Sequence, residues 1–284
     1  MIYTVIDDFV DYLQQVLGYC PSVYLHGSVM TDDFTPNSDV DLLVVVPQRL
    51  TEVQTTRLLS ARKFLAEVRK TANFLRIEGS IVFADDLLAG KSNAVLCYGN
   101  GKQSVVDYLP LTALDIFSLK TNGKLLCGED VLAKVAIPTR SQIVSQLQLA
   151  VNSVAQWGKA DGSKNAYECL FWLVRSLYTF QTNQLASKSD CMLWALDQGF
   201  VSEKVAMQAM AYRVTPTSDY TAKMKQNLIS AAWQKAIDGL LALAITKLNA
   251  TDTFVEQIST DDVYVEDGQP RQRQRQKLTF KRKK

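Results

Sequence analysis

The stretch YLHGSVMTDDFTPNSDVDLLVVV, residues 24–46, places Asp39 and Asp41 directly before a run of five apolar residues. An ionised carboxylate is costly to bury unless it is paired or binds a metal. Side chains two residues apart on a strand leave the same face, so the two carboxylates would point in one direction. The pattern predicts a buried strand over residues 40–46 that carries a pair of acidic groups at its start.

A Gly-Ser pair precedes these aspartates, with ten residues between Ser28 and Asp39. Glycine lets a backbone approach a phosphate closely, and a chain that turns into a helix offers N–H groups to an anion. Mg²⁺ prefers hard oxygen ligands and often binds one or two carboxylates together with substrate phosphates. Taken alone, Gly27-Ser28 is typical of a turn, and NSDVD of a helix cap or solvated loop. Together they favour a phosphoryl- or nucleotidyl-transfer site.

The composition is that of a soluble globular protein: 284 residues, 47% hydrophobic and 21% charged. The net charge is +2, but the eight basic residues from Arg271 onward leave −6 on residues 1–270. We find no apolar run of roughly 20 residues and no secretory signal at the start. Five dispersed cysteines indicate reduced thiols, and His26 is the single histidine. We therefore expect a cytoplasmic protein without a membrane segment.

The first part of the chain mixes helices and strands. Apolar spacing predicts a helix over 2–17, and Thr51 with Gln54 predicts a capping box that starts a helix ending near Lys70. Runs rich in β-branched and aromatic residues predict strands at 22–25, 40–46, 73–83 and 103–111. The expected fold class is α+β, with a mixed sheet and helices in residues 1–136.

Beyond Pro138 the pattern becomes helical throughout. Amphipathic or buried helices are predicted at 141–158, 165–184, 187–199, 202–214 and 221–249. Residues 137–250 are therefore predicted to form an all-helical bundle. Residues 251–284 are an acidic and then basic tail that we expect to be disordered.

The motif of Gly-Ser, ten residues and Asp-Val-Asp before an apolar strand resembles the signature of the DNA-polymerase-β-like nucleotidyltransferase superfamily. More narrowly, LHGSVMTDDFTPNSDVDLLVVV resembles the aminoglycoside 3''/9-adenylyltransferases, the streptomycin and spectinomycin resistance enzymes. The likeness spans roughly residues 20 to 245 and includes LRIEGSIVF, DIFSLKTNGKLLCGED and AYECLFWLVRSLYTFQTNQLASKSDCMLWAL. It implies a nucleotidyltransferase domain at 1–136 and a helical domain at 137–250 that closes the active site.

The resemblance also implies roles for individual residues. Asp39 and Asp41 would bind Mg²⁺, as a pair of ions, and ATP would be the co-substrate. Glu78 would be the base on the acceptor hydroxyl. Strand alternation places Glu78 on the face opposite the apolar side chains, where it could also simply be solvated. Asp107 is the rival candidate for the third carboxylate. Nucleotide contacts are implied for Gly27, Ser28, Arg175 and Lys188.

Lys188 follows a serine at a predicted helix start, where a cation is unfavourable beside the helix dipole. A bound polyphosphate would relieve this, whereas the plain alternative is a solvated lysine.

The acceptor side of the resemblance is Trp157, Asp161 and Glu168. Polycationic aminoglycosides favour carboxylates and an aromatic face. Aligned on Tyr167, Asp161 is in register, Trp157 is one residue off, and Asn165 replaces a family acid. Trp157 could instead be a packing residue at a helix end.

The expected function is AMP transfer from Mg-ATP to a hydroxyl of an aminoglycoside or aminocyclitol antibiotic, with pyrophosphate release and resistance. The partners would be small molecules, with a monomeric protein and no membrane. One alternative keeps the chemistry but uses another small molecule, a nucleic-acid end or a protein as acceptor, which the basic tail alone supports. Another is a non-catalytic nucleotide-binding or antitoxin-like module, which the intact set of motif residues opposes.

Overall fold

The computed structural model describes residues 2–90, 94–99, 102–105, 111–161, 163–250, 253–266 and 269–282, with backbone alone for 94–99, 102–105, 164 and 253 onward. The chain divides into two compact units. Unit 1 is Met1–Pro138, Leu185–Asp190 and Met210–Tyr220; unit 2 is Thr139–Gln184, Cys191–Ala209 and Thr221–Lys284. The main division lies close to the expected one, but two later segments, 185–190 and 210–220, group with unit 1 instead of with the helical part.

Unit 1 contains a mixed sheet, as the α+β prediction requires. Its described strands are β1 (Ser22–His26), β2 (Val40–Val46), β3 (Ile77–Phe83), β4 (Ala94–Gly99), β5 (Lys102–Val105) and β6 (Lys124–Cys127). They lie in the order β5-β4-β3-β2-β1-β6. The β2–β3 pair is parallel and the other neighbouring pairs are antiparallel.

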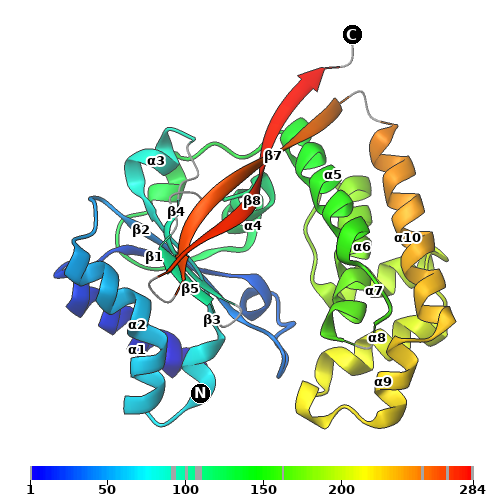
Figure 1. Cartoon of the computed structure of the whole chain (residues 1–284), viewed down its shortest axis with the longest axis horizontal. Helices are drawn as coiled ribbons and strands as arrows, with labels where there is room; N and C mark the ends of the chain where they lie inside the picture. Colours follow the sequence, from blue (N-terminus) through cyan, green and yellow to red (C-terminus); the bar gives the residue numbers. More distant parts are fainter. Residues whose placement is uncertain are drawn as a thin grey trace. The chain divides into compact units, whose positions relative to one another are not determined.

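Helices cover both faces of this sheet (Figure 1). One apolar cluster joins α1 (Ile2–Leu17) and α2 (Glu52–Val68) to Leu42, Val44 and Val46. The opposite cluster joins Leu43 and Val45 to α3 (Ala84–Leu88), α4 (Ala113–Asn122) and the 3-10 turn η3 (Val131–Lys134). Because β2 is buried on both sides, its sequence is a continuous apolar run and not an alternating one.

The strand predicted over 73–83 begins later than expected. The 3-10 turn η2 (Ala72–Arg76) precedes β3, and Leu75 in that turn is 48% exposed. The buried Arg62 on α2 donates from Nη1 to the carbonyl oxygens of Leu75 (3.1 Å) and Ile77 (2.6 Å). Arg62 therefore fixes the point at which the turn becomes a strand. Of the strand predicted over 103–111, residues 106–110 lie outside the described residues.

Unit 2 is helical over its described residues up to Asn249. The helices of this region are α5 (Arg140–Trp157), α6 (Lys164–Thr182), α7 (Lys188–Asp197), α8 (Glu203–Val214), α9 (Ala222–Leu228) and α10 (Ala231–Asn249). The helices α5, α6 and α10 pack against one another. No described helix is by itself long and apolar enough to cross a membrane, and α9 with α10 pass that test only as a pair bent by 41°.

The single helix predicted over 221–249 is in fact two helices. The side chain of Ser230 accepts a hydrogen bond from the N–H of Trp233 and so starts α10 after α9 has ended. Serine competes in this way with continued helix formation. Trp233 is fully buried, so the break also orients the apolar side of α10.

The tail expected to be disordered instead contains a paired hairpin. Strand β7 (Thr253–Glu266) is antiparallel to β8 (Gln269–Arg282), with Asp262 opposite Arg273. The β-branched and aromatic residues within TFVEQISTDDVYVE favour a strand, a local signal that the charge pattern obscured.

Arg62→Leu should lower the free energy of unfolding by about 2 kcal/mol more than Arg57→Leu, because it leaves two carbonyl groups without their donor. Arg57 is the matched control, since it lies on the same helix with an exposed side chain. Urea denaturation of both variants measures the difference. Equal losses would show that Arg62 does not stabilise the start of β3.

Candidate active site

The Gly-Ser bend and the second aspartate are in direct contact. Strand β1 ends at His26, the register partner of Asp41, and the 3-10 turn η1 (Gly27–Met30) follows. Gly27 has a φ of +74°, and a Cβ added to it would lie 1.9 Å from Oδ2 of Asp41. Only glycine fits there, because the carboxylate of Asp41 occupies the space that any other side chain needs. The helix expected after Gly27 is only this short turn.

Glu78 lies beside Asp41 on the neighbouring strand. The two are register partners in the parallel β2–β3 pair, so their side chains leave the same face of the sheet, and both are partly buried. A Cβ on Gly79 would lie 1.8 Å from the Leu42 carbonyl oxygen, so the strands approach closely here. The rival acid, Asp107, lies outside the described residues.

Arg76 holds the turn that precedes Asp39. Its Nε and Nη2 donate to the Ser38 carbonyl oxygen (2.9 and 2.6 Å), and Nη2 also donates to that of Thr35 (2.8 Å). The guanidinium lies 4.6 Å from the ring centroid of Phe34. Desolvation lowers the pKa of Arg76, while the nearby charge of Asp39 raises it. Arg76 thus presents Asp39 in a fixed turn beside a positive charge.

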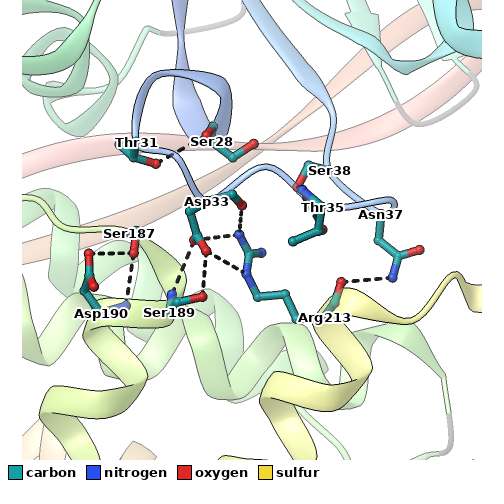
Figure 2. Close-up of polar contacts among 10 residues, drawn as sticks. All are labelled: Ser28, Thr31, Asp33, Thr35, Asn37, Ser38, Ser187, Ser189, Asp190 and Arg213. Atoms are coloured by element: carbon teal, nitrogen blue, oxygen red, sulfur yellow. Dashed lines mark hydrogen bonds and ion pairs between the residues drawn. The ribbon is translucent and has the colours of Figure 1, made fainter. Parts of the chain in front are cut away.

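A distant helix end is attached to the loop between the Gly-Ser bend and the aspartates (Figure 2). The Asn37 side-chain amide donates to the carbonyl oxygens of Thr215 (2.6 Å), Tyr212 (3.3 Å) and Arg213 (3.3 Å), and its oxygen accepts from the N–H of Thr217 (3.2 Å). Asn37 therefore caps the last turn of α8. The sequence analysis used this asparagine only as part of a motif and missed its capping role.

Lys188 begins α7, as the sequence predicts, and belongs to unit 1. The Ser187 hydroxyl accepts from the N–H of Asp190 (3.0 Å) and donates to its Oδ2 (2.7 Å), which closes a reciprocal cap. The Asp190 carboxylate therefore already compensates the positive helix end. The helix start is therefore explained without a bound polyphosphate, and the nucleotide contact of Lys188 stays a prediction.

The remaining predicted site residues lie in unit 2. Arg175 is half-buried on α6. Trp157 ends α5 and donates from Nε1 to Ser153 Oγ (3.3 Å). Asp161 accepts from the Ser163 hydroxyl (2.6 Å) and N–H (2.9 Å), and these bonds lower its pKa.

Two of the predicted acceptor residues share a neighbour. The pKa of Cys169 is raised to about 12, mainly by burial and to a smaller extent by the charges of Asp161 and Glu168. A Cβ on Gly158, the residue after Trp157, would lie 3.5 Å from Cys169 Cβ. The end of α5 therefore packs close to Cys169, whose pKa also responds to the charges of Asp161 and Glu168.

The donor chemistry of the first site suits a hard cation. Carboxylate oxygens, which hard cations prefer, are available from Asp39, Asp41 and Glu78. Because Gly27 has no side chain, the carboxylate of Asp41 can lie against its backbone. Within the described part of the chain, no group of three or more His, Cys, Asp or Glu residues is placed to hold a metal. The assignment of Mg²⁺ to Asp39 and Asp41 thus stays a prediction, in which a nucleotide completes the ligand set.

Gly27→Ala should destabilise the fold more than Gly18→Ala. Both glycines have a left-handed φ, +74° and +79°, but a Cβ on Gly18 meets nothing within 4 Å. Gly18→Ala should therefore lose only the backbone term of about 1–2 kcal/mol, whereas Gly27→Ala must also displace the Asp41 carboxylate. Denaturant unfolding of both variants tests this. Equal losses would mean that Asp41 moves aside without cost.

His26 should titrate below its ordinary pKa of 6.5, because desolvation lowers the value and the Asp115 carboxylate only partly opposes it. As the pH falls through 6.5 towards the folded pKa, the unfolded chain binds the proton first, so the free energy of unfolding should decrease in that window. Proton NMR of the single imidazole measures the pKa directly. A midpoint at or above 6.5 would contradict the burial argument, and His26→Gln should remove this component of the pH dependence.

Known proteins share parts of this sequence and of this fold. Residues 6–90 match the family model of the nucleotidyltransferase domain, a range that includes Gly27, Ser28, Asp39, Asp41 and Glu78. No curated protein sequence gives a significant match. Among solved structures, the chain is similar to spectinomycin adenyltransferase AAD(9) from Enterococcus faecialis, solved with ATP and spectinomycin.

That similarity has a TM-score of 0.55 at 14% sequence identity and covers 84% of this chain and 98% of the other. At such low identity the likeness shows a shared fold. The family match concerns the chemistry: residues 6–90 are similar to a nucleotidyltransferase domain, and the chain is an enzyme of the nucleotidyl-transferring class.

Proposed function

We propose that this enzyme transfers AMP from ATP to a hydroxyl of an aminoglycoside or aminocyclitol, such as streptomycin or spectinomycin, and so confers resistance. The observation that carries the proposal is the position of Asp41, whose carboxylate packs on Gly27 and neighbours Glu78 on one face of the sheet. The fold shared with AAD(9), whose structure contains ATP and spectinomycin, supports the choice of donor and acceptor.

Binding of the nucleotide is assigned to the Gly27–Ser28 bend and the acidic pair. Asp39 and Asp41 would hold Mg²⁺, which when bound neutralises triphosphate charge. The Ser28 hydroxyl would donate to a phosphate oxygen next to the bend. Lys188 would add a positive charge from the first turn of α7, and Arg175 is the further cation that the family resemblance implies.

The chemical step needs a base next to the acceptor hydroxyl, and we assign this role to Glu78. Glu78 would accept the hydroxyl proton while the acceptor oxygen forms a bond to the α-phosphorus of ATP. The bond from that phosphorus to the bridging oxygen then breaks, AMP stays on the acceptor, and pyrophosphate leaves. Because Glu78 is the register partner of Asp41, proton acceptance would occur beside the group that holds the nucleotide.

The acceptor class follows from the charge of the residues in unit 2. The lowered pKa of Asp161 keeps its carboxylate ionised. The charges of Asp161 and Glu168 both act on Cys169. Carboxylates at Asp161 and Glu168 together with the indole of Trp157 would suit a polycationic sugar, since the charges would attract its ammonium groups and the indole would offer an apolar face. A nucleic-acid acceptor depends on the basic tail alone, and there β8 is paired with the acidic strand β7.

Pyrophosphate release from ATP should depend on the drug and on the three acids. With the full chain, Mg²⁺ and spectinomycin or streptomycin, Glu78→Gln should lower kcat by about 10²-fold or more, as expected for loss of a general base. Asp39→Asn and Asp41→Asn should abolish the Mg²⁺-dependent rate. Asp32→Asn is the matched control, because Asp32 lies in the same loop with an exposed side chain.

Two outcomes would overturn parts of this proposal. If ATP yields no pyrophosphate with any aminoglycoside or aminocyclitol in a panel, the acceptor class is wrong. If Asp39→Asn and Asp41→Asn keep the rate of Asp32→Asn, the site itself is wrong. Expression in a sensitive bacterium, with Glu78→Gln as the inactive comparison, tests resistance directly.

A further inference from the structure

Asp33, which neither the motif nor the family resemblance singles out, joins three segments of unit 1 (Figure 2). It lies in the loop between the Gly-Ser bend and the acidic pair, and its N–H donates to the Ser28 carbonyl oxygen (3.3 Å). Its carboxylate accepts from Arg213 at the end of α8 and from Ser189 in the first turn of α7. A single side chain thus holds together the bend and two distant helix ends.

The contact with Arg213 is a buried ion pair. Nη2 of Arg213 lies 2.6 Å from Oδ2 of Asp33, and Nε donates to Oδ1 at 3.3 Å. The side chains are 5% and 10% exposed, and Nη2 also donates to the Asp33 carbonyl oxygen. The planar guanidinium meets the carboxylate through two nitrogens, so the pair fixes both the distance between Arg213 and Asp33 and the orientation of their side chains.

The contact with Ser189 connects Asp33 to the residue that follows Lys188. The Ser189 hydroxyl donates to Oδ1 of Asp33 (2.6 Å), and the Ser189 N–H donates to Oδ2 (3.3 Å). Lys188 is the preceding residue, and the Ser187–Asp190 cap fixes it from the other side. The backbone that carries Lys188 is therefore bonded, through one carboxylate, to the loop that carries Ser28.

We propose that the Asp33–Arg213 pair is a positioning device that holds Lys188 at a set place relative to the Gly27–Ser28 bend, so that both engage one polyphosphate. This inference rests on the proposed function, because it assigns Lys188 to the nucleotide. Asp33 touches no substrate; its negative charge is matched by Arg213, and its effect on ATP is exerted through the position of Lys188.

A double-mutant cycle tests this. The affinity for ATP with Mg²⁺ is measured by calorimetry in the wild type, Asp33→Asn, Lys188→Met and the double variant. Asp33→Asn should weaken ATP binding by about fivefold or more in the wild-type background and by less than about twofold once Lys188 is methionine, because residues that act as one unit are not additive. Asp8→Asn, which breaks the more exposed Asp8–Arg69 pair, should leave the affinity unchanged.

A second variant is needed in case Asp33→Asn fails to fold, because that substitution removes the carboxylate that pairs with the buried Arg213. Ser189→Ala removes only the 2.6 Å hydroxyl contact and leaves the ion pair intact. It should weaken ATP binding in the wild-type background and have no effect with Lys188→Met. Urea unfolding of each variant separates lost stability from lost affinity.

The outcomes distinguish the two proposals. An equal loss from Asp33→Asn or Ser189→Ala in both backgrounds would show that Asp33 supports the fold and not Lys188, and would overturn this inference alone. Unchanged affinity in Lys188→Met would overturn this inference and the assignment of Lys188 to the nucleotide, while leaving the roles proposed for Asp39, Asp41 and Glu78 in place. Absence of ATP binding by the wild type would overturn the proposed function.

Discussion

The packing of the Asp41 carboxylate on the backbone of Gly27 is the constraint on which the site depends. With a φ of +74° and the Asp41 carboxylate in the place of a Cβ, position 27 favours glycine, and the register of β1 against β2 sets His26 opposite Asp41. The register of β2 against β3 then places Glu78 beside Asp41. A slip of one residue in either pairing would move the acidic group to the opposite face of the sheet. Two strand registers and one glycine therefore set the arrangement of the acidic groups.

The strand β2 is buried on both faces. Leu42, Val44 and Val46 pack under α1 and α2, while Leu43 and Val45 pack towards α3 and α4. Because both faces of the run are apolar, its hydrophobic pattern alone specifies the register weakly, and the charged residue at its start is what a slip would misplace. The acidic residues occur only where this run begins, at the edge of the core, where a carboxylate stays partly accessible to a ligand.

Local signals in the sequence predicted much of this fold, and long-range contacts account for the differences. The bounds of α1 and β2 and the Thr51–Gln54 capping box were predicted because periodicity and capping depend on neighbours in sequence. The later start of β3 depends on Arg62, which lies 15 residues before Ile77. Asp33 and Arg213 are separated by 180 residues, so no local pattern reveals their pairing. A charged residue inside the apolar MAYRV segment was the one available hint that Arg213 has a buried partner.

The use of a buried ion pair to join these segments has a physical reason. The entropic cost of closing a loop rises only slowly with its length, so holding residues 210–220 in unit 1 does not require a strong contact. Apolar packing alone could meet that cost. Apolar contacts are non-directional, however, and would allow the first turn of α7 to rotate or slide. A buried ion pair adds little net stability, but it penalises every arrangement that separates its charges. Where a cation must meet a polyphosphate at one place, this penalty for misplacement is the useful property.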